Sequence, residues 1–138
     1  MNEVLVDSNV ILDLFENDPQ WAQWSENILE QYSKSHTLCI NPIIYSEISI
    51  GFNQIEELDK ALMACEFKML ALPKLALFLA GKTYLKYKRR KGTKNSPLPD
   101  FYIGAHATVS KLKLITRDMG RYRSYFSEVV LISPQTNP

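Results

Sequence analysis

The chain has 138 residues and a formal net charge of +1, from 16 basic and 15 acidic side chains. Its 46% hydrophobic and 22% charged residues exclude a disordered chain, and its length suits a single domain over residues 1–138. It contains no apolar run long enough to span a membrane, and its N-terminus does not resemble a signal peptide, so we expect a cytoplasmic protein with no membrane partner.

Apolar periodicity and turn residues predict strands that alternate with helices along the chain. In chain order we expect a strand at 4–6, a helix at 10–15 capped by Ser8 and Asn9, a helix opened by Pro19, a strand at 37–40, a helix from Asn41, a helix at 54–65, a strand or extended link at 67–72, a helix opened by Pro73, a loop at 93–99, a helix at 99–111, a strand at 112–116, a loop with one possible helical turn at 117–126, and a strand at 129–132. This alternation implies an α/β fold with a parallel sheet covered by helices on both faces.

Three acidic side chains are expected at the edge of this sheet where the strands end. Asp7 follows the first strand, and Asp118 lies just past the strand over residues 112–116. Asp100 begins the helix that leads into that later strand, which places it near the same edge. Because ligands of open α/β sheets bind outside the carboxyl ends of the strands, we expect these carboxylates to form a site.

A fourth acid, Glu47, lies within a predicted helix among isoleucines. It shares roughly one helix face with Ile43, Ile44 and Ile50. A glutamate on an apolar face is costly unless a metal ion or a basic side chain pairs with it.

A cluster of these acids predicts a bound cation. Carboxylates that converge without one repel each other. Ligation by oxygen alone suits Mg²⁺ or Mn²⁺ better than zinc or copper, and such ions can activate water and neutralise charge on a phosphodiester. The reaction class that follows is phosphodiester hydrolysis.

Polar and basic residues near the acids are candidate helpers. Ser8 and Thr116 place hydroxyls beside the acids, and Asn9 is a candidate for orienting a carboxylate or a water. The side chains expected to contact RNA phosphates are Arg117, Arg121 and Arg123, with Tyr122 beside them, and the basic run that includes Lys88, Arg89, Arg90, Lys91 and Lys94. The basic run equally fits a solvated helix end, where Lys and Arg are favoured by the helix dipole.

Four segments in this order resemble the motifs of PIN domains, especially the VapC toxins of type II toxin–antitoxin systems. They are residues 6–12 around Asp7, residues 45–48 around Glu47, residues 98–107 around Asp100, and residues 114–118 followed by Tyr122 and Phe126. The resemblance spans almost the whole chain.

The resemblance implies a three-layer α/β/α fold with a central, mostly parallel sheet of four to five strands. It implies an Mg²⁺- or Mn²⁺-dependent endoribonuclease with Asp7, Glu47, Asp100 and Asp118 as catalytic and metal-binding residues. It also implies a homodimer and a cognate antitoxin whose C-terminal segment covers the active site. Arg121 stands where some members carry another acid, which favours one tightly held ion over two.

Other interpretations stay open from the sequence alone. Each acid taken singly also fits a helix cap, a turn or a buried ion pair. A non-catalytic PIN-like scaffold that binds RNA or protein would share the fold, and loss of one or more acids would mark it. A haloacid-dehalogenase phosphatase needs a second Asp where Asn9 stands. Candidates for a dimer face are Leu58, Leu62, Leu75 and Phe78.

Overall fold

The computed structural model describes residues 2–134. They contain a five-stranded sheet in the order β3-β2-β1-β4-β5, in which every neighbouring pair is parallel. The strands are β1 (Asn2–Val6), β2 (His36–Ile40), β3 (Lys68–Met69), β4 (Lys113–Ile115) and β5 (Leu131–Ile132). The α/β fold with a parallel sheet of four to five strands is confirmed.

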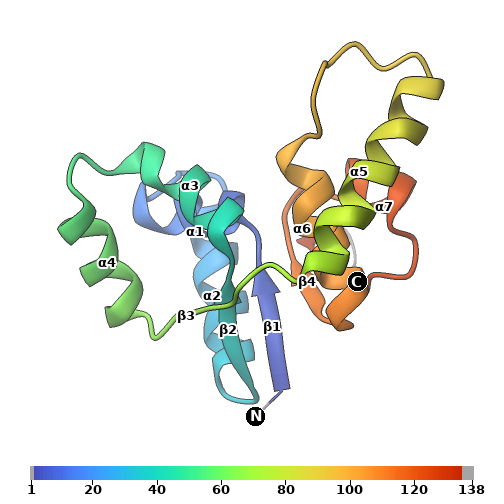
Figure 1. Ribbon diagram of the computed structural model, residues 1–138. Helices are drawn as coiled ribbons and strands as arrows, with labels where there is room; N and C mark the ends of the chain where they lie inside the picture. Colours follow the sequence, from blue (N-terminus) through green and yellow to red (C-terminus); the bar gives the residue numbers. More distant parts are fainter. Residues whose placement is uncertain (1, 135–138) are drawn as a thin grey trace.

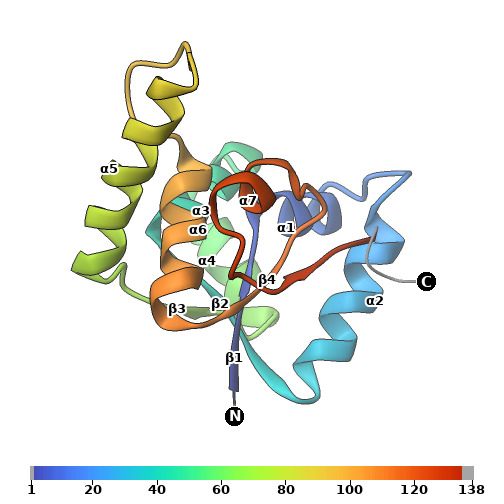
Figure 2. The same cartoon turned by 90° about the vertical axis from the view of Figure 1, so that its right-hand side faces the viewer.

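Helices cover both faces of this sheet. They are α1 (Ser8–Phe15), α2 (Ala22–Ser33), α3 (Pro42–Ile48), the short 3₁₀ helix η1 (Ser49–Gly51), α4 (Ile55–Ala64), α5 (Lys74–Arg89), α6 (Pro99–Ser110) and α7 (Gly120–Tyr125). Figure 1 shows α5 standing beside α6, away from α4, and Figure 2 shows α5 and α6 on one side of the sheet with α1 and α2 on the other. The molecule therefore has the expected three layers.

The central strand, β1, fixes the position of the functional edge. Its apolar residues Val4, Leu5 and Val6 are completely buried, as expected for a strand with helices on both faces. The chain passes from β1 to β2 on one side and later returns to β4 on the other, so the strand order reverses at β1. The backbone N–H of Asp7 still donates to the carbonyl of Ile115 at 2.9 Å, which carries Asp7 beside the end of β4.

Several local predictions were wrong in detail. Asp7 itself caps α1 and accepts the N–H of Ser8, so Ser8 is the first helical residue and not the cap. Helix α2 begins at Ala22, three residues after Pro19. The segment expected to hold one turn at most contains the six-residue helix α7. Since α3 ends at Ile48 and η1 follows, Ile50 is 83% exposed and does not share a buried face with Glu47.

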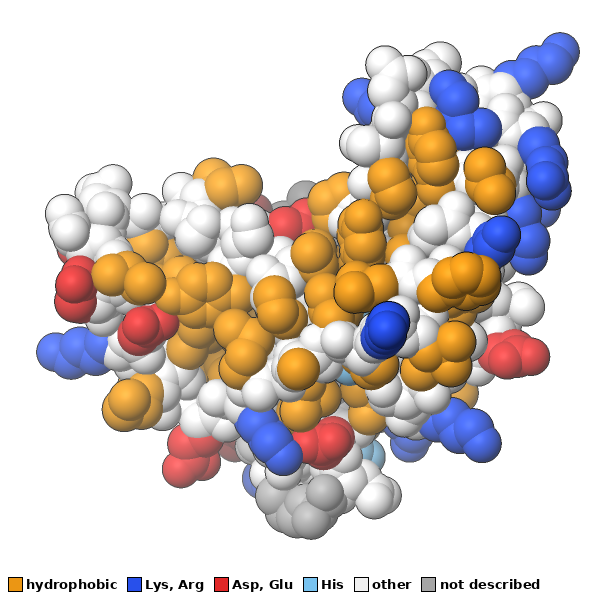
Figure 3. All heavy atoms as spheres, viewed as in Figure 1, with side chains coloured by type: hydrophobic (Ala, Val, Ile, Leu, Met, Phe, Trp, Pro, Cys, Tyr) orange, Lys and Arg blue, Asp and Glu red, His pale blue; other side chains and the backbone are white. Residues whose placement is uncertain are grey.

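Two of the residues expected at a dimer face belong to the core. Leu58 and Leu62 on α4 are only 2% and 7% exposed, because they close the inner side of that helix. Leu75 and Phe78 on α5 are 63% and 64% exposed. Figure 3 shows hydrophobic side chains lining the hollow between α4 and α5. Of these four residues, the two on α5 therefore lie at the surface.

Two other observations complete the fold. Cys39 is buried and Cys65 half-buried, and both are free thiols. Of the helices in residues 2–134, none has the length and apolarity needed to cross a membrane.

Two glycines give opposite expectations for the same substitution. A Cβ at Gly104 on α6 would overlap the ring of Phe126, whereas a Cβ at Gly81 on α5 would meet nothing within 4 Å. We expect Gly104→Ala to lower the free energy of unfolding by about 1–3 kcal/mol through overpacking. We expect Gly81→Ala to raise it by about 0.5–1 kcal/mol, because alanine loses less backbone entropy in a helix. Urea denaturation measures both, and equal effects would contradict the close packing of α6 on Phe126.

Candidate functional site

The site lies at the carboxyl ends of β1 and β4, where the order of the strands reverses. Asp7 is 4% exposed and Thr116 is fully buried, and the two side chains are in direct contact. A reversal of strand order in a parallel sheet leaves a crevice between diverging connections, which is where such sheets bind ligands. The edge predicted for the acids is therefore the edge on which they lie.

The carboxylate of Asp7 is held by donors from three parts of the chain. Oδ1 accepts the backbone N–H of Ser8 at 2.8 Å. Oδ2 accepts the hydroxyl of Thr116 at 2.9 Å and the hydroxyl of Tyr122 at 2.8 Å. These bonds fix the carboxylate in one orientation at the centre of the site.

Glu47 is brought to Asp7 by the way α3 begins. Asn41 is buried at the end of β2, and its Oδ1 caps α3 by accepting the N–H of Ile44 at 2.9 Å. Its Nδ2 lies 3.0 Å from Nδ1 of buried His106, which makes this histidine a structural residue. Glu47 lies in the second turn of the helix fixed in this way, and its Oε1 accepts the Ser8 hydroxyl at 2.9 Å. Ser8 therefore joins Glu47 to Asp7.

Asp100 reaches the same cluster from the first turn of α6. The hydroxyl of Tyr122 that donates to Asp7 also lies 3.5 Å from Oδ1 of Asp100. Oδ2 of Asp100 forms an ion pair with Nη1 of Arg121 at 3.6 Å. Adjacent residues of α7 thus contact both oxygens of Asp100.

Asp118 lies at the rim of the site. Its side chain is exposed, and Oδ1 accepts the N–H of Gly120 at 3.0 Å. Its backbone N–H donates to the hydroxyl of Thr116 at 3.2 Å, which ties this turn to Asp7. The charge of Asp118 raises the pKa of Asp100, so the two carboxylates are neighbours without a direct bond.

The environment of the acids disfavours their charged forms. Burial raises the pKa of Asp7 from 3.8 to about 6, hydrogen bonds from Tyr122 and Thr116 oppose the rise, and the charges of Asp100 and Glu47 add to it. Burial also raises the pKa of Glu47 and of Asp100, and Arg121 opposes the rise at Asp100. A buried cluster of this kind binds a cation more favourably than isolated surface acids would.

The donor set suits a hard divalent cation. Carboxylates and hydroxyls supply only oxygen, which fits Mg²⁺ or Mn²⁺. Across residues 2–134, no three His, Cys, Asp or Glu side chains stand close enough together to hold an ion as they are. The reason lies in the contacts above, because Ser8, Thr116, Tyr122 and Arg121 occupy the oxygens that face the centre.

Two other predicted helpers, Asn9 and Arg117, make contacts within the protein. The Nδ2 of Asn9 donates to Thr116 at 3.3 Å, and its Oδ1 accepts the N–H of Arg117 at 3.2 Å, so Asn9 supports the strand end. The guanidinium of Arg117 instead faces Asp13, with Nε to Oδ2 at 2.6 Å and Nη2 to Oδ1 at 3.0 Å. It also lies over the ring of Trp21, 5.4 Å from the centroid. These contacts give Arg117 a structural role in joining β4 to α1.

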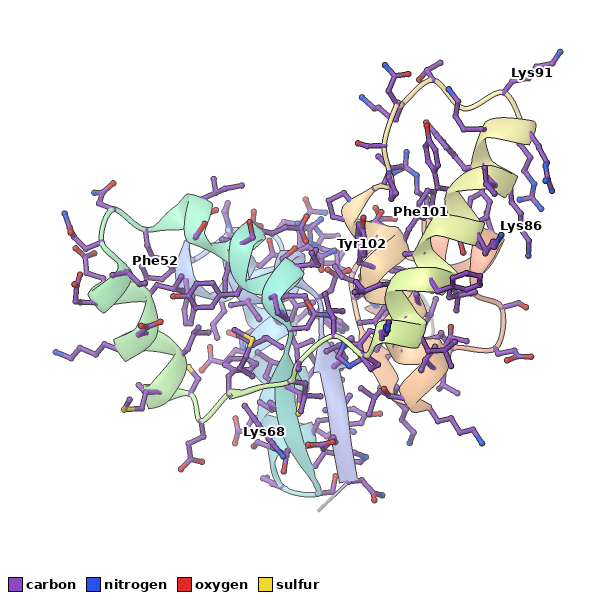
Figure 4. The ribbon with its side chains drawn as sticks, viewed as in Figure 1. Phe52, Lys68, Lys86, Lys91, Phe101 and Tyr102 are labelled. Carbon is purple, nitrogen blue, oxygen red and sulfur yellow. The ribbon has the colours of Figure 1, made fainter. Side chains whose placement is uncertain are left out.

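The basic run forms a projecting arm at the end of α5. Arg89, Lys91 and Lys94 are exposed, Lys88 donates to the carbonyl of Gly92 at 3.1 Å, and Arg90 lies 4.8 Å from the Tyr125 ring centroid. Figure 4 shows Lys91 pointing outward from the tip of the arm, with Lys86 on the outer side of α5. In Figure 3 blue side chains gather on the same end. Arg123 is exposed on α7.

The arm is tied to the body by Tyr87. Its hydroxyl accepts the backbone N–H groups of Thr93 and Lys94, both at 3.1 Å. Its ring packs edge-on against Phe101 of α6, with centroids 5.6 Å apart. Through Tyr87 the basic arm thus contacts Phe101, the residue that follows Asp100.

Sequence reasoning missed two residues of this site. Tyr122 was expected to hold phosphates, whereas it bridges Asp7 and Asp100 from a buried position. Asp13 was not singled out, although it is 4% exposed and holds Arg117. An acid within the apolar helix over residues 10–15 was the available signal for Asp13, by the argument that was applied to Glu47.

Comparison of the sequence with models of protein families identifies the domain that contains this site. The model described as PIN domain matches residues 4–126. The chain belongs to the PIN domain family. No curated protein matches the sequence.

Solved structures share the fold of this PIN domain at low sequence identity. The structure of VapBC2 from Rickettsia felis bound to a DNA fragment from its promoter aligns with a TM-score of 0.72 and 16% identity, over 94% of this chain and 97% of that one. A toxin–antitoxin complex from Klebsiella pneumoniae aligns at 0.68 and 21%, over 96% and 98%. FitAcB from Neisseria gonorrhoeae aligns at 0.60 and 20%, over 97% and 99%. The fold predicted from the motifs is confirmed.

The raised pKa of Asp7 predicts a pH-dependent cost to stability. The native protein binds the Asp7 proton more tightly than the unfolded chain does, so stability falls as pH rises from about 4 to about 6. The shift from 3.8 to about 6 corresponds to about 3 kcal/mol above that range. We expect Asp7→Asn to be more stable than the native protein by about 1–3 kcal/mol at pH 8 in EDTA, and to lose this advantage at pH 4.

Urea denaturation at the two pH values measures this difference. The amide can replace the carboxylate because both hydroxyl donors have a second acceptor nearby, the carbonyl of Asp118 for Thr116 and Asp100 for Tyr122. An Asp7→Asn protein that is destabilised more at pH 8 than at pH 4 would contradict the burial cost.

Proposed function

We propose that this PIN domain is an Mg²⁺- or Mn²⁺-dependent endoribonuclease that acts as the toxin of a toxin–antitoxin pair. The observation that carries the proposal is the convergence of Asp7, Glu47 and Asp100 through two shared hydroxyls, those of Ser8 and Tyr122. Three carboxylates with raised pKa values, at the crevice of a parallel sheet, suit a divalent ion and a phosphodiester better than any role in packing.

The residues of the cluster have distinct proposed roles. Asp7, Glu47 and Asp100 would hold the ion, and Asp118 at the rim would hold it directly or through water. The bound ion supplies Lewis-acid polarisation and activation of a water for attack on phosphorus. Thr116 orients Asp7, while Asn9 keeps Thr116 in place through its own amide. Hydrolysis breaks one P–O bond of the backbone and adds one water across it.

The basic arm is proposed to bind the RNA backbone. Lys91 projects from the tip of the arm (Figure 4), and Arg89 and Lys94, close to it in the sequence, are also exposed. Positive side chains that lie near a nuclease centre attract the phosphates and hold the strand in register without reading its sequence. On α7, Arg121 carries positive charge to the acids through its ion pair with Asp100, whereas Arg123 is exposed beside Met119 and Phe126.

The protein partners follow from the structural neighbours. Those neighbours are toxin–antitoxin complexes, which supports a cognate antitoxin for this chain. A second copy of the chain is proposed to pack on α5, where Leu75 and Phe78 are mostly exposed. A scaffold that binds without cleaving is the competing function, and the experiment below separates the two.

The first test is cleavage of labelled RNA by purified chain freed of any antitoxin, with Mg²⁺, Mn²⁺ or EDTA. We expect cleavage that EDTA abolishes and that Asp7→Asn or Asp100→Asn lowers by more than about 100-fold, because even the residues that support metal ligands contribute 10- to 100-fold. Glu56→Gln on α4 removes an exposed acid away from the site and should cleave like the native protein.

Other outcomes point elsewhere. Cleavage by folded Asp7→Asn at the native rate would contradict the assignment of the acids. A folded native protein that neither binds Mn²⁺ in calorimetry nor cleaves total RNA would favour the scaffold function.

The arm is tested by the salt dependence of RNA binding. Replacing Arg89 and Lys91 together with glutamine should weaken binding and reduce the slope of log K against log salt by about 1.4, from two lost phosphate contacts on a single strand. Fluorescence anisotropy with the Asp7→Asn protein measures binding without cleavage. Lys111→Gln with Lys113→Gln, at the amino ends of the strands, is the matched control and should leave the slope unchanged.

A further inference from the structure

Arg121 places a positive charge inside the acid cluster. Its Nη1 lies 3.6 Å from Oδ2 of Asp100, and its side chain remains 45% exposed. The next residue, Tyr122, is 2% exposed and donates to Asp7. Because both residues belong to the short helix α7, the buried tyrosine fixes the backbone from which the arginine extends, while the guanidinium keeps room to move.

The same guanidinium lies between the acids and the basic arm. The pKa of Tyr87 at the base of the arm is lowered mainly by the hydrogen bond from the backbone of Lys94, and the charge of Arg121 lowers it further. Arg121 therefore acts electrostatically on both Asp100 and Tyr87, which flank it. A nucleic-acid backbone that runs from Tyr87 to Asp100 would therefore come near the charge of Arg121.

We propose that Arg121 is a built-in cation of the site: it neutralises Asp100 in competition with a divalent ion, limits the site to one such ion, and transfers to an RNA phosphate once the ion has taken Asp100. This inference rests on the proposed function and names a specificity-determining residue for it.

The geometry favours this exchange over a fixed ion pair. At 3.6 Å the contact is a single, long ion pair, in contrast to the two-bond pair of Arg117 with Asp13 at 2.6 and 3.0 Å. Exposed pairs of this kind contribute little to stability, so a divalent ion displaces the guanidinium at small cost. A freed guanidinium beside the ion is a strong phosphate ligand, because its planar donors match phosphate oxygens.

The proposal predicts that metal affinity and activity change in opposite directions. Arg121→Gln should bind Mn²⁺ about 3- to 10-fold more tightly than the native protein, since a competing charge is removed from Asp100. At saturating Mn²⁺ the same variant should cleave RNA with kcat/KM about tenfold lower, because one charged phosphate contact is lost. Arg121→Lys keeps the charge and should stay within about twofold of the native Mn²⁺ affinity.

Calorimetric titration of the intact chain with Mn²⁺, without RNA, is the deciding experiment. Lys113→Gln makes the same change in net charge at the opposite edge of the sheet and is the matched control. One Mn²⁺ per native chain, with tighter binding in Arg121→Gln alone, supports the proposal.

Several outcomes overturn it. Two ions bound by the native protein would do so, as would equal affinities of native and Arg121→Gln proteins, or tighter binding in Lys113→Gln as well. Absence of Mn²⁺ binding in every folded variant would overturn the proposed function together with this inference. If RNA cleavage requires Mn²⁺ but Arg121→Gln leaves the Mn²⁺ affinity unchanged, this inference alone is overturned.

Discussion

The pairing of β1 with β4 is the constraint on which the rest of the site depends. The ladder continues past the last strand residue, where the N–H of Asp7 donates to Ile115, and it sets Thr116 against the Asp7 carboxylate. Burial at the centre of the sheet raises the pKa of that carboxylate, and the sheet supplies the rigidity that keeps it there. Every other functional group is placed relative to this point, Glu47 through Ser8 and Asp100 through Tyr122.

The buried acids lower the stability of the fold, because their charged forms are disfavoured away from water. Ionised carboxylates at low exposure are favourable only with a cation or with several hydrogen bonds, and the chain provides the bonds from Ser8, Thr116 and Tyr122. Arg121 supplies charge at Asp100. The large apolar core around β1 offsets this cost, so the fold can carry a cluster of buried acids that destabilises it.

Much of the fold and the identity of the acids could be predicted from the sequence. Residues 4–6 and 112–116 are short apolar runs followed by Asp7 and Asp118, and in a parallel sheet such runs end at one edge, so the placement of these two acids at the same edge followed from topology alone. Contacts that depend on exact orientation could not be predicted. Tyr122 reaches Asp7 across 115 positions of sequence, and Arg117 turns to Asp13 because α1 happens to present an acid there. The helix α7 has six residues, too few for a periodic pattern to be recognised.

The attachment of the basic arm at Tyr87 separates the surface of the arm from the position of Asp100. Gly92 lets the chain fold back closely over Tyr87, where a Cβ would overlap the ring, and the tyrosine hydroxyl then holds the backbone of Thr93 and Lys94. Beyond that fastening, residues 95–97 are a loop with no regular structure before α6 starts at Pro99. We expect this loop to tolerate insertions and substitutions without a shift of α6 or Asp100, because loops without regular structure accept such changes. The surface of the arm can therefore change while the clustered acids keep their positions.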